Sequence, residues 1–506
     1  MYSKIKQHFI DHPNSISLIQ KDKEITYKEL EKLIEETADR LQHSLNIKED
    51  DVVLVAIPNN IDAVKTIYAI NKIGAIADMM HHISPANMML NNAEFTEAKY
   101  LLMIDSCVRP FINEYSKYKD KIFLFASEGE ERVEGFNYFE DIPLSHKETR
   151  ECQDNKKTSF YLQSGSTTGK SKSICLNDFS FNLLVDEYPR LLKNKKNLNY
   201  ASVLPLHHGF GLCMCMHASL SFGDTLILFP KFKTQDVVDA MNKYKLHVIN
   251  GVPTIYEALL ANPNFSTSPN IKDIYMAMCG GDGTSRSLKE RWNKAMKDRG
   301  SQCLLCEGYG LTETVTGICV NTFDSYKIEG IGKPFSYAEM VIMDEKHNIL
   351  KPYEIGEICI KSECIMNGYL KDKAATDAAF YKDYLLTGDL GYIDEDGHIF
   401  FKGRKKRIIK VQGAMVFPQE IEELVEHIPG IKKACAVGVD DERKGSVVKL
   451  FIITLEGVNE EEIKEKIMFE AKNNLDKWSI PASIVVLNDF PKTPIGKVDF
   501  KVLAKM

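Results

Sequence analysis

Short apolar runs alternate with amphipathic helical segments along the first four-fifths of this 506-residue chain. The run Val52 to Ile57 has the length and composition of a buried strand, and a helical segment follows it from about Asp62 to Lys72. Strands that alternate with helices favour largely parallel sheets covered by helices on both faces. The sequence therefore predicts an α/β fold. Such sheets bind ligands at the carboxyl ends of their strands, so functional motifs are expected in the loops there.

The pattern of the sequence changes near Gly403, where a small α+β unit begins. Helices are expected at residues 418–427 and 460–474, and strands at 434–439 and 447–454. The basic segment GRKKRIIK, residues 403–410, has few apolar anchors and is interpreted as a linker. A chain of this length is too long for one compact core. We therefore expect a large N-terminal domain over 1–403 and a small C-terminal domain over 404–506.

Charge and composition exclude several classes of partner. The net charge is −7, so the basic excess that nucleic-acid binding requires is missing. No stretch approaches the roughly 18 apolar residues of a membrane span, and the first residues do not have the apolar core of a secretory signal. The twelve cysteines follow no spacing framework. Free thiols of this kind indicate a reducing compartment, so a cytoplasmic location is predicted.

The strongest local signal is a loop of glycine, serine, threonine and lysine in SFYLQSGSTTGKSKSI, residues 159–174. Backbone N–H groups, hydroxyls and ammonium groups together suit a polyphosphate. The segment fits a Walker A loop except at its first glycine, and it also fits the phosphate loop of adenylate-forming enzymes. The candidate phosphate-binding residues are Ser164, Gly165, Ser166, Thr167, Thr168, Gly169, Lys170 and Lys172.

Three further segments distinguish these two classes. They are EGYGLTET at 307–314, LTGDLGYIDEDGHIFFKGR at 386–404 and PKTPIGK at 491–497. Together with the loop, they resemble in order and spacing the superfamily of acyl- and aryl-CoA synthetases, peptide-synthetase adenylation domains and luciferases. The resemblance extends from about Thr26 to Lys497. Each motif alone is weak, and a Walker A enzyme is not expected to carry the other three.

The resemblance assigns nucleotide contacts to residues of several segments. It implies that Tyr309 stacks on adenine, Thr312 contacts the α-phosphate and Glu313 helps to hold Mg²⁺, which prefers oxygen ligands. Asp389 corresponds to a ribose contact, although an isolated Asp in this setting would more simply be a surface-turn residue. Arg404 corresponds to a second contact with the ribose or a phosphate. Further cofactor-binding positions implied by the motifs are Gly281, Asp282, Gly283, Glu307, Gly308 and Gly310.

The C-terminal part supplies three more candidates by the same resemblance. Lys497 corresponds to the lysine that offsets negative charge in the adenylation step. Lys406 corresponds to the pivot about which the small domain of these enzymes turns, and Gly413 lies on the path by which the thiol enters. The resemblance thus implies that the domain over 404–506 is mobile, with its hinge near residue 406.

The acid substrate is less defined by the sequence. His208, in LPLHHGFGL, corresponds to the histidine beside the acyl carboxylate. No Asp lies between His207 and Ala218 to pair with an α-ammonium group, so amino acids are disfavoured. Gly310 stands where acetate-specific relatives have Trp, which favours a longer acid. Residues 213–216 either line an apolar tunnel or pack as part of a helix, and both fatty and aryl acids fit this reading.

These observations predict an acid–thiol ligase that uses ATP, Mg²⁺, a small carboxylic acid and coenzyme A. No added segment lies between Thr314 and Asp389, which favours coenzyme A over a carrier protein as the acceptor. Three alternatives stay open. The chain could load the phosphopantetheine thiol of a carrier protein, act as a P-loop NTPase, or be a silent relative that only binds, given the serines at 166, 171 and 173.

Overall fold

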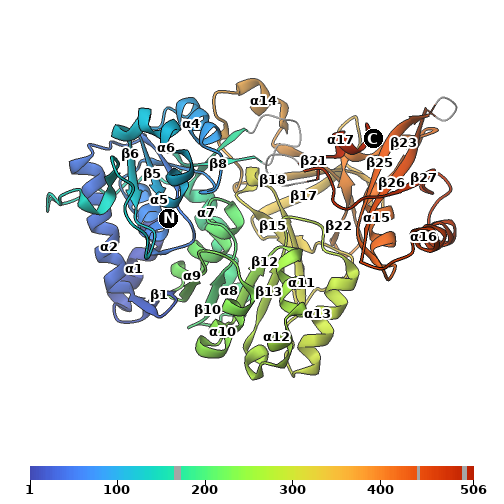
Figure 1. Ribbon diagram of the computed structural model, residues 1–506, viewed down its shortest axis with the longest axis horizontal. Coiled ribbons are helices and arrows are strands. Elements are labelled where there is room, and N and C mark those ends of the chain that lie inside the picture. The colour runs from blue at the N-terminus through green and yellow to red at the C-terminus, as the bar shows by residue number, and fades with distance from the viewer. Residues whose placement is uncertain (165–171, 442–444, 493–497) are drawn as a thin grey trace. The chain divides into compact units, whose positions relative to one another are not determined.

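A computed structural model describes residues 1–164, 172–441, 445–492 and 498–506 of the chain (Figure 1). The chain divides into two compact units. Unit 1 comprises Met1–Ser164, Ser171–Glu339 and Ser362–Ala378, and unit 2 includes Met340–Lys361 and Ala379–Met506. The predicted boundary at residue 403 falls inside unit 2, and a separately mobile domain over 404–506 stays a prediction.

Unit 1 contains a sheet with the strand order β16-β15-β14-β13-β12-β10-β11-β1-β2. The pairs from β14 to β1 along this order are parallel, and antiparallel pairs stand at both ends. The prediction of largely parallel sheets is therefore confirmed here. The strands are β1 Ile16–Gln20, β2 Lys23–Thr26, β10 Asn199–Ser202, β11 Thr225–Leu228, β12 Val248–Gly251, β13 Met276–Cys279, β14 Leu305–Gly310, β15 Gly317–Val320 and β16 Lys333–Pro334.

A second sheet of unit 1 has the order β19-β9-β8-β4-β3-β5-β6-β7. Its pairs from β8 to β7 are parallel, whereas β8, β9 and β19 are joined antiparallel. The parallel part includes the predicted run after residue 52, whose strand is buried along its whole length. The strands are β3 Val52–Ala56, β4 Ile76–Met79, β5 Tyr100–Ile104, β6 Ile122–Phe125, β7 Asn137–Tyr138, β8 Thr158–Gln163, β9 Ser173–Asn177 and β19 Gly368–Tyr369.

Helices of unit 1 pack on these sheets through buried stripes. The α2 helix, Tyr27–Asp39, begins with a capping box of Thr26 and Glu29 and continues as the π-helix η1, Arg40–Ser44. Figure 1 shows α11 beside β12 and β13, and the Tyr256 hydroxyl donates to carbonyls of both strands. The other longer helices are α1 Tyr2–Asp11, α3 Ile61–Lys72, α4 Ala86–Phe95, α7 Asp178–Val185, η5 Phe210–His217, α10 Thr234–Tyr244, α11 Pro253–Ala261 and α13 Arg286–Asp298.

The short helical segments of unit 1 connect the longer elements. They are α5 Asp105–Val108, η2 Arg109–Phe111, α6 Ile112–Tyr115, η3 Ser116–Lys121, η4 Phe139–Asp141, α8 Tyr188–Leu191, α9 Ala218–Ser221, α12 Pro263–Thr267, η6 Pro269–Asp273, η7 Thr312–Thr314 and α14 Lys373–Ala378.

Unit 2 combines three sheets with several helices. One sheet has the order β17-β18-β21-β20, with β22 paired antiparallel to β21. The predicted small α+β part follows, with a buried apolar cluster around Ile421 and Leu450. Its elements are β17 Ala338–Met343, β18 Gly356–Ser362, β20 Phe380–Tyr381, β21 Tyr384–Ile393, β22 Ile399–Arg404, η8 Lys405–Arg407, β23 Ile409–Val411, β24 Ala414–Val416, α15 Pro418–Glu426, β25 Ile431–Asp441, β26 Gly445–Thr454, α16 Glu460–Asn474, β27 Ser483–Val486 and α17 Phe500–Leu503.

Two further observations concern the cysteines and the length of the apolar helices. Each of the twelve cysteines lies in the described part of the chain, and none of them forms a disulfide there. Among the helices of the described residues, none has both the length and the apolar character needed to cross a bilayer.

Candidate active site

The glycine-rich loop joins two antiparallel strands. Gln163 ends β8 and Ser173 begins β9, and the two residues are paired. At the loop's base the Ser164 N–H donates to the Lys172 carbonyl at 2.8 Å, and the Lys172 N–H donates to the Ser164 hydroxyl at 2.9 Å. A Walker A loop requires a helix directly after the loop. The Walker A interpretation is therefore wrong for this segment.

The predicted contacts inside the loop lie outside the described residues. These are Gly165, Ser166, Thr167, Thr168, Gly169 and Lys170. Lys172, by contrast, is described and half-buried, and its ammonium lies 4.3 Å from the centre of the Tyr369 ring. An ammonium over an aromatic face is attracted by the ring quadrupole. Lys172 is thus oriented by an aromatic side chain that the sequence analysis did not single out.

Glu313 meets the same aromatic residue. The Tyr369 hydroxyl donates to a Glu313 carboxylate oxygen at 2.8 Å, and the Met366 N–H donates to the Glu313 carbonyl at 2.7 Å. Burial, followed by the charge of Glu313, raises the pKa of Tyr369, so the phenol stays a donor. Among the described residues, the Glu313 carboxylate accepts this one side-chain hydrogen bond. Its remaining lone pairs suit a magnesium ion, and we call Lys172, Tyr369 and Glu313 the Glu313 group.

The turn that carries Glu313 is strained. Thr312–Thr314 form a single 3₁₀ turn, after which Val315 has φ 65° and ψ −56°. The Thr316 N–H donates to the Thr314 carbonyl at 2.7 Å, which closes a γ-turn about Val315. This form of γ-turn is rare, and positive φ is costly for a β-branched residue. Strain of this kind is found at functional sites, where surrounding packing maintains it.

The residues EGYG lie in β14 and not in a loop after it, which differs from expectation. A Cβ at Gly310 would lie 1.5 Å from the Thr316 carbonyl oxygen. Glycine is therefore required because the backbone of the strained turn approaches it. The prediction that the chain accepts an acid longer than acetate, made from the glycine at this position, stays a prediction.

Glu307 is engaged inside unit 1. Its carboxylate pairs with the buried Lys289 ammonium at 2.5 Å and accepts from the Thr284 N–H at 3.0 Å. These contacts fix the end of the loop that begins at Gly280, where a Cβ would lie 3.0 Å from the Gly308 carbonyl oxygen. Glu307 thus positions the predicted adenine loop, and its side chain is already paired.

The remaining predicted adenine residues lie at the surface of unit 1. Gly281, Asp282 and Gly283 are exposed, and the Asp282 carboxylate accepts from the Gly283 N–H at 3.0 Å. Tyr309 is half-buried in β14 opposite Cys319. The 281–283 loop is thus exposed, and Tyr309 is partly so.

The predicted ribose residues lie in unit 2. Asp389 is 1% exposed in β21, and one of its carboxylate oxygens lies 3.3 Å from the Arg404 Nε on the neighbouring strand β22. The surface-turn reading of Asp389 is therefore wrong. Glu357 extends this arrangement, because it accepts from the Gly388 N–H at 2.9 Å and pairs with the Lys405 ammonium at 2.9 Å. We call Asp389, Arg404, Glu357 and Lys405 the Asp389 group.

The predicted hinge and thiol-entry residues are both exposed in unit 2. Lys406 lies in the 3₁₀ turn η8, and Gly413 lies in the turn between β23 and β24 with φ 87°. Next to Lys406, the Arg407 guanidinium pairs with Glu422 at 2.6 Å and lies 3.8 Å from the Phe500 ring centre. Lys497, the predicted catalytic lysine, lies outside the described residues.

The segment predicted to contact the acid is a buried helix. Residues 213–216 belong to the π-helix η5 and are at most 3% exposed. This burial fits packing as part of a helix, and a role in lining an apolar tunnel stays a prediction. His208 is exposed, and its ring lies 4.3 Å from that of His207.

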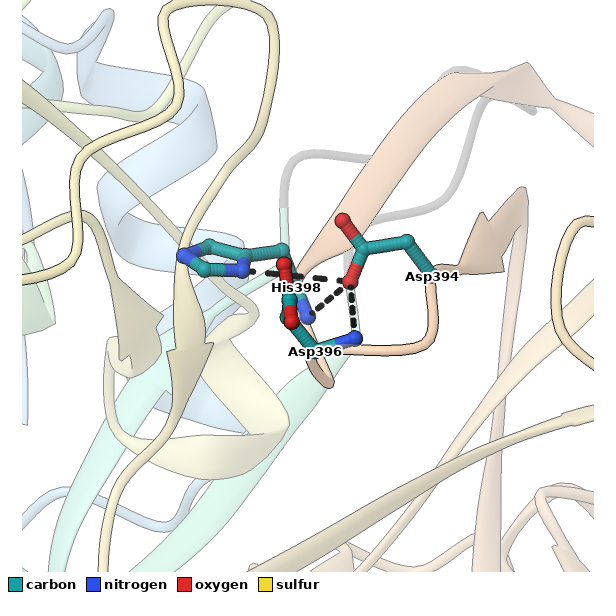
Figure 2. A group of neighbouring side chains, drawn as sticks. All are labelled: Asp394, Asp396 and His398. Carbon is teal, nitrogen blue, oxygen red and sulfur yellow. Dashed lines mark hydrogen bonds and ion pairs between the residues drawn. The ribbon is translucent and has the colours of Figure 1, made fainter.

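A group of potential metal ligands that the sequence analysis did not predict lies in the turn between β21 and β22 (Figure 2). One Asp394 carboxylate oxygen accepts from the N–H groups of Asp396 at 3.0 Å and His398 at 2.9 Å. The Asp394 side chain thereby closes the turn, as Asp does in many hairpin connections. These hydrogen bonds account for the cluster as part of the hairpin.

Comparison with known proteins places this geometry in a family. The AMP-binding enzyme family matches residues 6–370, and the AMP-binding enzyme C-terminal domain matches residues 420–497. The chain therefore belongs to the AMP-binding, or adenylate-forming, enzymes. This confirms the resemblance that the four motifs indicated.

Among the relatives are two kinds of coenzyme A ligase. A long-chain-fatty-acid–CoA ligase of Escherichia coli is 31% identical over 345 residues, which is 67% of this chain and 60% of that protein. The chain therefore spans about three-fifths of that relative's length. A 2-succinylbenzoate–CoA ligase of Listeria monocytogenes is 26% identical over 96% of this chain and 95% of that protein.

Solved structures confirm the fold. The o-succinylbenzoate CoA synthetase of Bacillus subtilis, in complex with its acyl-adenylate intermediate, has a TM-score of 0.86 at 23% identity and covers 99% of this chain and 97% of its own. ATP-bound MatB from Rhodopseudomonas palustris has a TM-score of 0.88 at 20% identity and covers 100% of this chain and 98% of its own. At this identity the likeness establishes the α/β fold with its C-terminal part.

Proposed function

We propose that the chain is an acid–thiol ligase, which activates a carboxylic acid as an acyl-adenylate and transfers the acyl group to coenzyme A. In the first step a carboxylate oxygen attacks the α-phosphorus of ATP, and pyrophosphate leaves. In the second step the thiol sulfur attacks the acyl carbonyl, AMP leaves and the thiol proton passes to solvent. The acid is fatty or aryl, the two classes that the relatives' names contain.

One observation carries this proposal. Lys172, Glu313 and Tyr369 are far apart in the sequence, and they meet in unit 1 with a cation, a carboxylate and a phenol in contact. A cation that can face phosphates beside a carboxylate that can hold Mg²⁺ is the arrangement that phosphoryl and nucleotidyl chemistry requires. Bound Mg²⁺ would neutralise charge on the phosphates of ATP.

The other roles belong to the same proposal. Tyr309 would stack on adenine, Asp389 and Arg404 would bind the ribose, and Thr312 would donate to the α-phosphate. Lys497 would offset the charge between the attacking carboxylate and that phosphate, and His208 would lie beside the acid. The thiolation step would need a rotation near Lys406 that brings the loop of Gly413 to the thiol path.

The test is isotope exchange between pyrophosphate and ATP across a panel of fatty and aryl acids. The proposal expects exchange that depends strictly on an added acid. A silent relative that only binds gives no exchange with any acid. Formation of a thioester with free coenzyme A then separates a CoA ligase from an enzyme that loads a carrier protein.

Two variants test the residues that the resemblance assigns. Lys497→Ala is expected to lower exchange by orders of magnitude and to leave thiolation of a supplied acyl-adenylate intact. Lys406→Pro is expected to slow thiolation more than adenylation, because it restricts the hinge. If either variant lost adenylation and thiolation equally, the role assigned to that residue would be contradicted. The cytoplasm stays the predicted location, in accord with cysteines that form no disulfides within the described chain.

A further inference from the structure

Four histidines of unit 1 form a continuous row. His81 and His82 follow β4, and His207 and His208 follow β10. Successive ring centres lie 4.9 Å apart from His82 to His81, 4.3 Å from His81 to His207 and 4.3 Å from His207 to His208. The row thus joins segments that follow strands of two different sheets, at the strand ends where α/β proteins bind ligands.

The end of the row at His208 adjoins the Glu313 turn. A Cβ at Gly209 would lie 1.7 Å from the Val315 carbonyl oxygen, so the two backbones are in direct contact. The buried Asn59 side chain fixes the same loop, because it donates to the Leu204 carbonyl at 2.7 Å and accepts from the Leu206 N–H at 3.1 Å. His208 is therefore held beside the turn that carries the proposed magnesium ligand.

Three of the four imidazoles of the row are partly withdrawn from solvent. His81, His82 and His207 are half-buried. Burial lowers the pKa of all three, that of His82 to about 4, and neighbouring imidazoles add to the effect for His82 and His207. Among the described residues, the ring nitrogens of His82 and His207 have no hydrogen-bond partner. These nitrogens are not among the buried side-chain atoms that lack a partner. They are therefore open to solvent, and a ligand that covered them would have to replace their hydrogen bonds to water.

The chemistry of the ligand follows from the geometry of the donors. Within the described residues, one group of potential metal ligands has its donor atoms within 4.8 Å of one another, and it consists of Asp394, Asp396 and His398. The four histidines of the row do not form such a group. The row does not converge as a metal site would. Each neutral imidazole instead offers one N–H donor, so a line of them offers successive donors to an anionic group.

We propose that the histidine row binds a second anionic group of the acid, so that the chain prefers a dicarboxylic acid to a monocarboxylic one. This inference rests on the proposed ligase function. The reacting carboxylate lies at the His208 end, beside the Glu313 turn, and the distal carboxylate lies along the row toward His82. A purely aliphatic tail in that place would leave the imidazoles desolvated without a partner, which selects against it.

The experiment compares acids of equal length that differ in one carboxylate. Acid-dependent pyrophosphate exchange is measured with pairs such as hexanoate and adipate, or benzoate and phthalate. At least one diacid is expected to exceed its partner in kcat/KM by about tenfold or more, the value of one hydrogen bond to a charged group. Monoacids that match or exceed every paired diacid would overturn the inference while upholding the ligase. If none of the acids supported exchange, the proposed ligase function itself would be contradicted.

Variants then locate the preference. His82→Leu and His81→Asn are each expected to reduce the ratio of diacid to monoacid kcat/KM by about tenfold and to retain monoacid activity. A variant that folds poorly lowers both activities, so the ratio isolates the binding role. His12→Leu, at an exposed histidine outside the row, serves as the matched control and should leave the ratio unchanged. An unchanged ratio in both row variants would contradict the assignment.

Discussion

The Glu313 group of unit 1 and the Asp389 group of unit 2 hold their carboxylates in different ways. The half-buried Glu313 accepts from a phenol, and the nearby Lys172 ammonium faces the phenol ring. Asp389 is buried, and a guanidinium nitrogen lies 3.3 Å from its carboxylate. Within the described part of the chain, Glu313 is oriented without an ion pair, whereas Asp389 is paired within its own hairpin.

The difference indicates separate tasks. A carboxylate that is oriented but not neutralised can give its charge to a metal ion, and it then acts where charge develops during reaction. A buried carboxylate held by an arginine keeps a fixed hydrogen-bonding position, which suits a sugar hydroxyl that does not react. Substitutions in the Glu313 group should therefore lower the rate of reaction, and substitutions in the Asp389 group should weaken nucleotide binding.

The largest effect is expected for Glu313→Gln. The amide keeps the size of the side chain and an acceptor for Tyr369, and it removes the charge that would hold Mg²⁺. The rate of acid-dependent pyrophosphate exchange should fall on the order of 10²–10³-fold, with a smaller change in KM for ATP. Steady-state kinetics at several Mg²⁺ concentrations measure this.

Glu94→Gln is the matched control for that variant. Glu94 also accepts from a tyrosine, Tyr118, at 2.8 Å, and this pair is exposed. The control is expected to leave exchange unchanged. A similar loss in both variants, or full activity of Glu313→Gln, would remove the catalytic distinction between the two groups.

A smaller effect of another kind is expected for Asp389→Asn. The loss of a charged acceptor for the ribose should raise KM for ATP about 10–100-fold, and kcat should change little because the contact is the same in ground and transition states. Asp105→Asn is the control, since Asp105 is also buried and lies 3.2 Å from an arginine, Arg109. It is expected to lower the melting temperature without a change in KM. A kcat effect in Asp389→Asn would break the comparison.

Tyr369→Phe sharpens the account of the Glu313 group. Phenylalanine keeps the aromatic face under the Lys172 ammonium and loses the hydrogen bond to Glu313. The Mg²⁺ concentration for half-maximal exchange should rise about 3–10-fold, as expected for one hydrogen bond. Tyr369→Leu also removes the ring and should have the larger effect. Tyr118→Phe, which removes the exposed tyrosine–glutamate bond, should leave the Mg²⁺ dependence unchanged.

Much of the fold could be predicted because its signals are local. The predicted helix at 460–474 matches α16, Glu460–Asn474, in full, and the predicted apolar run from Val52 to Ile57 contains β3, Val52–Ala56. The motif EGYG was expected in a loop and lies in β14, since its pairing with β15 depends on residues that follow the motif. Local sequence patterns cannot reveal such a partner.

The candidate site was predictable only in part for the same reason. Motifs identified Glu313 and Asp389, whereas Tyr369, Glu357 and the pair His81 and His82 were missed as contributors. Each of them reaches its partner through a contact between distant segments, as Tyr369 does by way of the β19–β9 pairing. A tyrosine in a short polar segment has no property in the sequence alone that distinguishes it from a surface residue.

The smallest effect on activity is expected at Asp78, a third buried carboxylate. It lies in β4 and accepts from Asn92 at 2.7 Å, Thr96 at 2.9 Å and Gln163, at the base of the phosphate loop, at 3.3 Å. No cation is among the groups that shift the pKa of Asp78, and burial raises this pKa from 3.8 to about 7. The folded chain therefore binds this proton more tightly than the unfolded chain does.

The sign of the resulting pH dependence follows from that shift. The stability that Asp78 contributes is fully present below about pH 4 and is lost as the pH rises through about 7. Asp78→Asn does not ionise, so its advantage over the wild type should grow between about pH 5 and pH 8, by roughly 1–4 kcal/mol. Denaturant unfolding at both pH values measures it, and KM for ATP should not change. If KM changed as well, Asp78 would act through Gln163 on the loop and would belong with the Glu313 group. A pH-independent difference in stability would instead mean that Asp78 stays ionised in the folded chain.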